Sequence, residues 1–391
     1  MAIQKITTDI LKDNSVTGSK MSIGTPEAGD IVYYDGTDYV KLAKGTDGEV
    51  LKLESGLPAW GATSGGGSPS GGGGPSDAFI IAGGRGGAQS DDITNYSFTT
   101  SAESVWGQCS SNNGAGGGPS SGCSNSSTTH GYYSTGTIPN PSNPSSPTFS
   151  TNIDEYSYAS EGNSTIIGNT GQHKTVAGGV SSSTDAYILG GTGLNITGHS
   201  SNGHKFAFAT GSSSGSAIGL EIGKAGMGTH QDSTHGYTFG GVSGGGNNPV
   251  VTAVSSCCRF SFANDTTRED IGALNEISAG HATVGNATTA YHAGGSSQSN
   301  QGNTVFYTRI DSYTLASSST AADHGDLDVA QNGAYGASTN TTGIIVGGSG
   351  GGVNMANKQE FAYASNTTAT QLTALTSTAS GGGHGQVPPT F

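Results

Sequence analysis

Three histidines in glycine-rich stretches are the side chains with the widest range of chemistry in this chain. His173, His281 and His384 occur in GQHKTV, AGHATV and GGGHGQV, and we interpret them as recurring at one place in a sequence repeat. Imidazole carries protons near neutral pH and is a common metal ligand, so the three could bind a metal or an anion if the fold brought them together. The alternative, which we favour, is that each histidine marks the start of a strand and hydrogen-bonds locally.

An acidic stretch, DHGDLD, gives a second candidate site. Asp323, Asp326 and Asp328 have an oxygen-rich spacing that could hold Ca²⁺. The stretch lacks the residue order of an EF-hand loop, which favours a solvated acidic turn. We therefore expect no metal and no cofactor.

The four cysteines do not suggest a metal site, because no Cys-x-x-Cys spacing occurs. Cys109 and Cys123 flank a Gly/Ser/Asn loop that a disulfide could close, which would contribute about 3 kcal/mol. Cys257 and Cys258 are adjacent, and we expect two thiols on opposite faces of a strand rather than a strained bridge.

Composition excludes several classes of protein. The 391 residues are 32% hydrophobic and 11% charged, with 68 Gly, and the net charge is −14. A nucleic-acid partner would need a basic patch, which the sequence does not offer. No apolar run of about 18 residues occurs, so membrane insertion is not expected, and the N-terminus lacks a signal-peptide layout. Abundant Gly with 15 Tyr and 11 Phe favours an all-β fold with tight turns.

A Gly/Ser/Pro stretch, 61–76, is expected to be a linker between two parts. Residues 1–60 hold six Lys against nine Asp/Glu (−3), and residues 77–391 hold eight Lys/Arg against nineteen Asp/Glu (−11). In the first part, 31–34 and 39–42 should be strands joined by a DGTD turn, with a third at 50–53. So small a region has a poor core of its own, and we expect it to be stabilised by a partner surface or by oligomerisation.

The larger part, 77–391, repeats. An apolar run followed by a Gly pair recurs six times, with the second Gly at 84, 136, 191, 241, 295 and 348. The pairs are Gly83 and Gly84, Gly190 and Gly191, Gly240 and Gly241, Gly294 and Gly295, Gly347 and Gly348, and a variant with Thr135 before Gly136. Each pair should end an inner strand where the chain turns sharply.

An aromatic–small–aromatic motif follows each pair, as in Tyr156/Tyr158 and Phe206/Phe208. A spacing of two places both large side chains on one strand face, where they can pack on the next repeat. Units of roughly 50 residues with about four short strands predict the blades of a β-propeller, six in number.

The C-terminal GGGHGQV matches SAGHATV at 278–284, and the first repeat lacks such a strand. The C-terminal strand should therefore complete the first blade and close the ring. We expect Val387 to be buried between blades and His384 to be an ordinary repeat histidine.

Residues 77–391 resemble kelch-type β-propellers through the strand–Gly–Gly signature, although they lack the Tyr and Trp usual after the pair, and Trp106 is the only Trp there. Residues 1–60, with ITTDILKDNSVTGSK and GDIVYYDGTDYVKLAKGTDGEVLKLESGLPAW, resemble the N-terminal regions of bacteriophage tail-fibre and other virion-surface proteins. That resemblance implies that 1–60 attaches to the virion and that the distal domain faces outward.

Catalysis is not expected from these residues. Six-bladed sialidases would imply an arginine cluster and Asp-box turns, but the arginines are four scattered residues and no such box occurs. Kelch-type copper oxidases would imply a Tyr/His site with a Tyr–Cys crosslink, which no arrangement here demands.

Three long loops after Gly pairs should emerge on one face, where recognition usually lies. The alternative is that their length is merely tolerated. The binding residues we expect there are Asn140, Asn143, Phe149, Asn247, Asn248, Asn300 and Asn303. The sequence thus predicts a tail fibre or receptor-binding protein that is assembled in the host cytoplasm and exposed on the virion. It would be a homo-oligomer that binds virion proteins through 1–60 and a host glycan or protein through the propeller. A capsid decoration or head fibre, and a glycan-degrading propeller enzyme, remain the alternatives.

Overall fold

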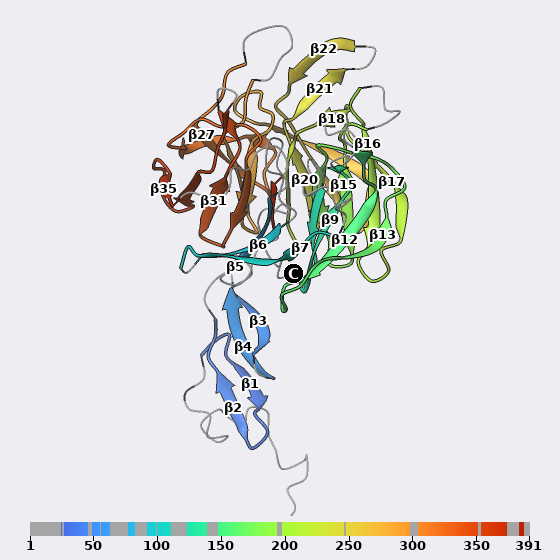
Figure 1. Cartoon of the computed structure of the whole chain (residues 1–391). Helices are drawn as coiled ribbons and strands as arrows, with labels where there is room; N and C mark the ends of the chain where they lie inside the picture. The colour runs from blue at the N-terminus through green and yellow to red at the C-terminus, as the bar shows by residue number, and fades with distance from the viewer. Residues whose placement is uncertain are drawn as a thin grey trace, which may run out of the picture. The chain divides into compact units, whose positions relative to one another are not determined.

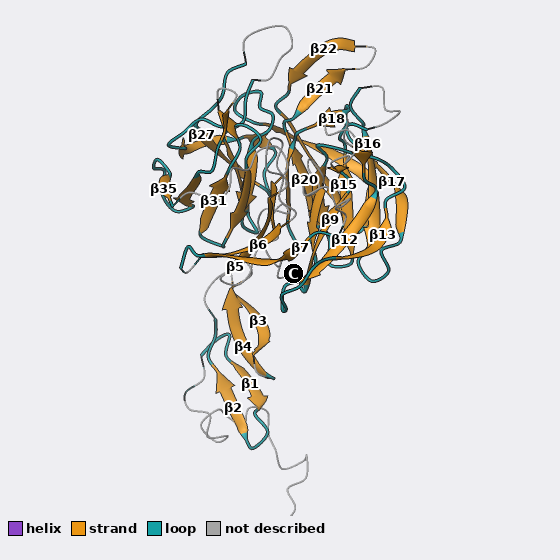
Figure 2. Ribbon diagram, viewed as in Figure 1, coloured by secondary structure: helices purple, strands orange, loops and turns teal. Residues whose placement is uncertain are grey.

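The computed structural model describes residues 25, 27–45, 49–54, 56–62, 77–82, 92–98, 100–110, 123–138, 148–193, 198–245, 248–297, 304–350, 353–373 and 383–386. Every regular element in these ranges is a β-strand (Figure 2). Within them, no helix is long and apolar enough to cross a membrane. The chain divides into two compact units, Met1–Thr63 and Ser64–Phe391. Most of the expected linker, 61–76, lies outside the described residues.

The first unit consists of two hairpins. They are formed by β1 (Ile31–Tyr34) with β2 (Tyr39–Leu42), and by β3 (Glu49–Glu54) with β4 (Leu57–Ala62). The three strands expected from the sequence are all present, and β4 is an addition. Asp35 forms the DGTD turn, because its carboxylate accepts the N–H groups of Thr37 and Asp38 at 2.8 and 2.9 Å.

The second unit contains six antiparallel sheets of four or five strands among its described residues (Figure 1). Sheet 1 is β36 (Gly383–Gln386), β5 (Asp77–Ala82), β6 (Asp92–Ser97) and β7 (Glu103–Gln108). Sheet 2 is β8 (Cys123–Ser126), β9 (His130–Ser134), β12 (Asn152–Ser157) and β13 (Thr165–Asn169). Sheet 3 is β14 (Gly178–Ser181), β15 (Asp185–Leu189), β16 (Asn202–Ala207) and β17 (Ser213–Gly219).

The remaining sheets follow the same order. Sheet 4 is β19 (Gly228–Gln231), β20 (His235–Phe239), β23 (Ser256–Ser261) and β24 (Asn264–Ala273), with β28 (Ser319–Thr320) added in parallel. Sheet 5 is β25 (Ala282–Gly285), β26 (Thr289–Ala293), β27 (Arg309–Thr314) and β29 (Ala322–Asp326). Sheet 6 is β30 (Tyr335–Ser338), β31 (Thr342–Val346), β34 (Lys358–Ala362) and β35 (Thr370–Leu372).

Sheet 1 joins the two ends of the unit. Strand β36 pairs with β5 so that Gly383 lies opposite Ala82 and Gln386 opposite Phe79, as the missing strand of the first repeat predicts. Strand β36 also contacts β30 of sheet 6 and β8 of sheet 2. Val387 lies outside the described residues.

Aromatic side chains pack each sheet on the next. The Tyr132 ring of sheet 2 stacks on Phe208 of sheet 3, with centroids 4.6 Å apart. Tyr291 of sheet 5 stacks likewise on Tyr363 of sheet 6 at 4.3 Å. Such contacts are the ones expected of the aromatic–small–aromatic motif, and each adds about 1 kcal/mol beyond area burial.

The first strands are buried and linked by polar side chains. The N–H of Ser126 donates to Ser181 Oγ at 3.0 Å, and the N–H of Ser181 donates to Gln231 Oε1 at 2.6 Å. Backbone donors on these strand edges are thus satisfied by a side chain of the following sheet. The unit is all-β and propeller-like.

Candidate binding face

Gly pairs turn the chain at one end of the sheets, directly after the second strands. The left-handed backbone there favours glycine, with φ of +63° at Gly190 and +56° at Gly240. Positive φ also occurs at Gly136, Gly191, Gly241, Gly294, Gly295, Gly347 and Gly348. Thr135, in the first slot of its pair, has φ of +63°. Gly83 and Gly84 lie outside the described residues.

In four of the pairs, the second residue bonds to the segment that leads into the next sheet. We call the segments 170–177, 221–227, 275–281 and 328–334 the lead-in segments, because each precedes a first strand. The N–H of Gly191 donates to Lys224 O at 2.8 Å, and that of Gly295 donates to Gln331 O at 2.7 Å. A Cβ on Gly190 would lie 2.4 Å from Lys224 O. At Gly190, glycine therefore suits the left-handed φ and is required for the close approach of the lead-in segment.

Further hairpins extend from the same end, which we call the connection face. They are β10 (Thr137–Ile138) with β11 (Thr148–Phe149), β21 (Val242–Gly245) with β22 (Asn248–Ala253), and β32 (Ser349–Gly350) with β33 (Val353–Asn354). Strand β21 also pairs with β18 (Lys224–Ala225), which lies in a lead-in segment. The β21–β22 hairpin is seen at the top of Figure 1.

Only two of the expected binding residues fall within the described chain. Phe149 is half-buried, with its ring centroid 6.0 Å from that of His173. Asn248 begins β22 and pairs with Gly245. The other expected residues, Asn140, Asn143, Asn247, Asn300 and Asn303, lie outside the described ranges.

A group of ion pairs around Arg309 on the connection face was not expected from the sequence. Arg309 pairs with Glu276 at 2.5 Å and with Asp311 at 2.9 Å, and its guanidinium lies 4.3 Å from the Tyr307 ring centroid. Burial raises the pKa of Asp311, against the lowering effect of Arg309. The cation is thus held by its own chain rather than offered to a ligand.

Two buried lysines occupy equivalent lead-in positions. Lys174 is 1% exposed, and its ammonium donates to Asn202 O at 2.6 Å and Gly190 O at 2.9 Å. Burial lowers the pKa of Lys174 to about 8. Lys224 is fully buried and pairs with Glu221 at 2.5 Å. Lys174 thus ties its lead-in segment to β16, and Lys224, which also donates to Ser256 Oγ at 3.4 Å, ties its own to β23.

The four cysteines are buried thiols outside any disulfide. Cys109 and Cys123 belong to separate hydrophobic clusters, so the disulfide considered for them is not formed. Cys257 packs in the apolar layer, whereas Cys258 donates to Glu221 at 3.0 Å. The adjacent thiols therefore lie on opposite faces of β23. Burial, and then Glu221, raise the pKa of Cys258 to about 12, which leaves the thiol protonated.

The three histidines do not share one position in the repeat, so that prediction was wrong. His384 lies within β36 opposite Ile81, whereas His281 immediately precedes β25. His173 lies beside Lys174, the residue equivalent to Lys224, and so falls further ahead of its strand. The sequence alignment of GGGHGQV with SAGHATV differs by two residues from the strand register in the structure, where His384 is equivalent to Thr283. Short Gly-rich stretches do not define a register.

Two carboxylates of the acidic stretch make separate local contacts. Asp323 accepts the N–H of Gly325 at 3.0 Å, and Asp326 accepts the Thr308 hydroxyl at 2.8 Å. Among the described residues, no group of three or more His, Cys, Asp or Glu could hold a metal ion.

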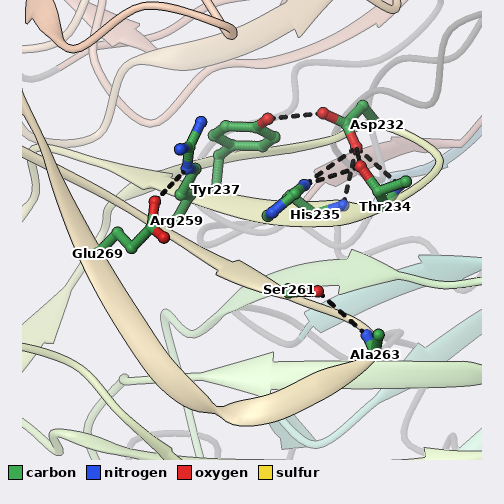
Figure 3. A network of polar contacts seen from close by, with 8 residues as sticks. All are labelled: Asp232, Thr234, His235, Tyr237, Arg259, Ser261, Ala263 and Glu269. Carbon is green, nitrogen blue, oxygen red and sulfur yellow. Dashed lines mark hydrogen bonds and ion pairs between the residues drawn. The ribbon is translucent and has the colours of Figure 1, made fainter.

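At the opposite end of sheet 4, a polar network resembles a catalytic triad in composition only (Figure 3). Asp232 accepts the Thr234 hydroxyl at 2.8 Å and the Tyr237 hydroxyl at 2.6 Å. The Thr234 hydroxyl also contacts His235 Nδ1 at 2.7 Å. Asp232 Oδ1 lies 3.8 Å from the same nitrogen, Nδ1. Because the carboxylate and the hydroxyl approach one nitrogen, the imidazole cannot relay a proton between them.

The same turn recurs without the acid. Ser182 Oγ accepts the N–H groups of Thr184 and Asp185 at 3.3 and 3.0 Å, as Asp232 Oδ1 accepts those of Thr234 and His235 at 2.7 Å. Equivalent turns begin at Ser127, Asn286 and Thr339. The network is therefore a repeated turn cap between first and second strands.

Comparisons with known proteins support the fold. No protein-family model and no curated protein matches the chain. Solved structures do match. One described as "Structure of YjhT" superposes with a TM-score of 0.61 at 12% identity, covering 80% of this chain and 99% of that one. At this identity the likeness concerns the fold alone.

Proposed function

We propose that the second unit is a six-bladed, kelch-like β-propeller closed by the C-terminal strand. Each of the six sheets would be one blade, and β36 would complete the first. The support is that six hydrophobic clusters each join two neighbouring sheets, the last joining sheet 6 to Tyr96 of sheet 1. In a ring, both apolar faces of every sheet pack against a neighbouring sheet, whereas separate sheets would leave these faces exposed to water.

We propose that the protein lies on the surface of a bacteriophage virion, as a tail fibre or receptor-binding protein. Residues 1–60 would attach it to other virion proteins, and the propeller would bind a glycan or protein of the host surface. The resemblance of 1–60 to such proteins motivates the proposal.

The observation that carries the attachment role is an apolar face on the first hairpin. Val32, Tyr34 and Tyr39 share one face of β1–β2 by register, and are 41%, 56% and 62% exposed. The Tyr34 and Tyr39 rings lie 5.5 Å apart. So much aromatic surface left in water on a small unit is typical of an interface.

Labelled full-length protein tests the two roles separately. It should stain host cells, and absence of staining would count against adhesion. A Val32→Ser/Tyr34→Ser/Tyr39→Ser variant should still stain cells but fail to enter virions, whereas Val105→Ser, 61% exposed on β7, should enter normally. Copy number per virion distinguishes tail from head, since few copies indicate a tail fibre and many indicate capsid decoration.

A further inference from the structure

Main-chain hydrogen bonds place the four lead-in segments side by side. Gly226 N donates to Val176 O at 3.0 Å, Gly280 N to Gly226 O at 2.9 Å, and Gly333 N to Gly280 O at 2.7 Å. These four residues occupy the same position in successive segments. The segments therefore form one continuous row across the connection face.

Val176 is the exception within this row. The backbone is left-handed at all four positions, with φ of +59°, +63° and +67° at the glycines and +55° at Val176. A β-branched residue is a genuine outlier there, because its Cβ crowds the carbonyl, at a cost of about 1–2 kcal/mol. Its side chain is 44% exposed, so burial does not offset this strain.

The other three lead-in segments each expose one aliphatic side chain as well. Ile222, Ile277 and Val329 are 40%, 45% and 36% exposed. Val305, which is 54% exposed, lies near the lead-in segments on the same face. The N–H of Ser297 donates to Val305 O, and the neighbouring Ser296 pairs with Ala279 in a lead-in segment. Among the described residues of the propeller unit, the only other large apolar residues that are exposed are Val105 and Ile166. The connection face is therefore the main apolar surface of that unit.

Few charges on this face are left uncompensated. Its cations are withdrawn: Lys174 and Lys224 are buried beneath it, and Arg309 is held by Glu276 and Asp311. Asp328 is an exposed carboxylate of the described lead-in segments, and residues 77–391 as a whole carry a net charge of −11. An acidic unit of this kind disfavours another copy of itself, polyanions and anionic lipid as partners.

We propose that the connection face docks a basic protein surface carrying apolar side chains, with Val176 as an anchor. The proposal rests on the proposed function for its biological setting, since it names the chemistry of the receptor. Aliphatic side chains supply buried apolar area, and the net negative charge of the unit favours a cationic partner.

Defined peptides test this chemistry on the full-length chain. The probe is a fluorescein-labelled amphipathic Leu/Lys peptide, with a Ser/Lys analogue of equal charge and a Leu/Glu analogue of equal apolarity. Saturable anisotropy change with the Leu/Lys peptide alone is expected. Equal binding of either analogue would overturn the proposal, as would preferential binding to phosphatidylglycerol vesicles.

Val176→Gly separates binding from folding. Because glycine relieves the strained φ, the variant should melt at a higher temperature and yet bind the Leu/Lys peptide about tenfold more weakly. Ile277→Ser should also weaken binding, whereas Val105→Ser, on an outer strand, should not. Unchanged binding by Val176→Gly together with Ile277→Ser would show that the row is not the docking surface.

The same samples distinguish this proposal from the proposed function. Host-cell staining without peptide binding would refute the docking chemistry and leave adhesion standing. Saturable peptide binding that responds to the variants, without host-cell staining, would support the docking surface and refute host adhesion.

Discussion

Lys358 and Glu103, 255 positions apart in the chain, form a buried ion pair between sheets 6 and 1. Their side chains are 2% and 12% exposed, and the Lys358 ammonium lies 4.9 Å from the centroid of the Tyr96 ring. The two ends of the second unit therefore meet through a charged and aromatic contact in addition to the β36–β5 ladder.

Removing one partner should be more harmful than removing both. Lys358→Met leaves the Glu103 carboxylate without its cation and should lower the free energy of unfolding by about 3–5 kcal/mol. The double variant Lys358→Met/Glu103→Leu should recover most of that loss, because no buried charge remains. Urea unfolding of the three proteins measures the difference, and equal stabilities of single and double variants would contradict it.

Glycines of the pairs should be far less tolerant than glycines on the outer strands. At Gly241, φ is +103° and an added Cβ would lie 2.9 Å from Ala225 O, whereas Gly219 has nothing within 4 Å. Gly241→Ala should cost more than about 2 kcal/mol, and Gly219→Ala should be close to neutral. Thermal melts provide the comparison, and a neutral Gly241→Ala would show that the pair is not a steric requirement.

Repetition explains why so much of this fold could be predicted. The Gly pairs and the paired aromatics recur at a spacing that a stack of similar sheets imposes, and even Thr135 took the left-handed backbone of its slot. The β36–β5 pairing followed from counting repeats. Its register did not, because GGGHGQV has no alternation of apolar and polar side chains to fix which face is buried.

The candidate sites were harder to predict for a related reason. Lys174, Lys224 and Arg309 appear in the sequence as ordinary surface charges, and only the close approach of neighbouring segments buries them. Val176 stands beside Ala177 and two glycines in the sequence. Its strain became visible only when the backbone placed it in register with Gly226, Gly280 and Gly333.

Stability should decline as the pH falls below about 6.5. Burial lowers the pKa of His281 to about 3 and of His230 to about 4, and lowers that of His292 too. These histidines stay neutral in the folded protein while the unfolded chain takes up protons below pH 6.5. Stability is therefore full above that pH, and each buried histidine should cost roughly 2 kcal/mol by pH 5.

Urea midpoints between pH 7.5 and pH 5 measure this slope. His281→Leu should flatten it. The range stays above the pH where carboxylates titrate, so Asp232 and Glu221 do not contribute. A slope that is the same in His281→Leu would show that this histidine is not the source.

Deleting residues 380–391 should destabilise the propeller unit, because it removes β36 and leaves the edge of β5 without the partner that now pairs with Phe79 through Ala82. An unpaired strand edge invites association with other chains, so aggregation should accompany the lower melting temperature. Deleting residues 1–63, which form the other compact unit, is the matched control and should leave the propeller transition in place. Light scattering during a thermal melt reports both effects. If the C-terminally truncated protein melts like the intact chain and stays monodisperse, closure by the C-terminal strand is refuted, because the remaining strands would then hold the first sheet on their own.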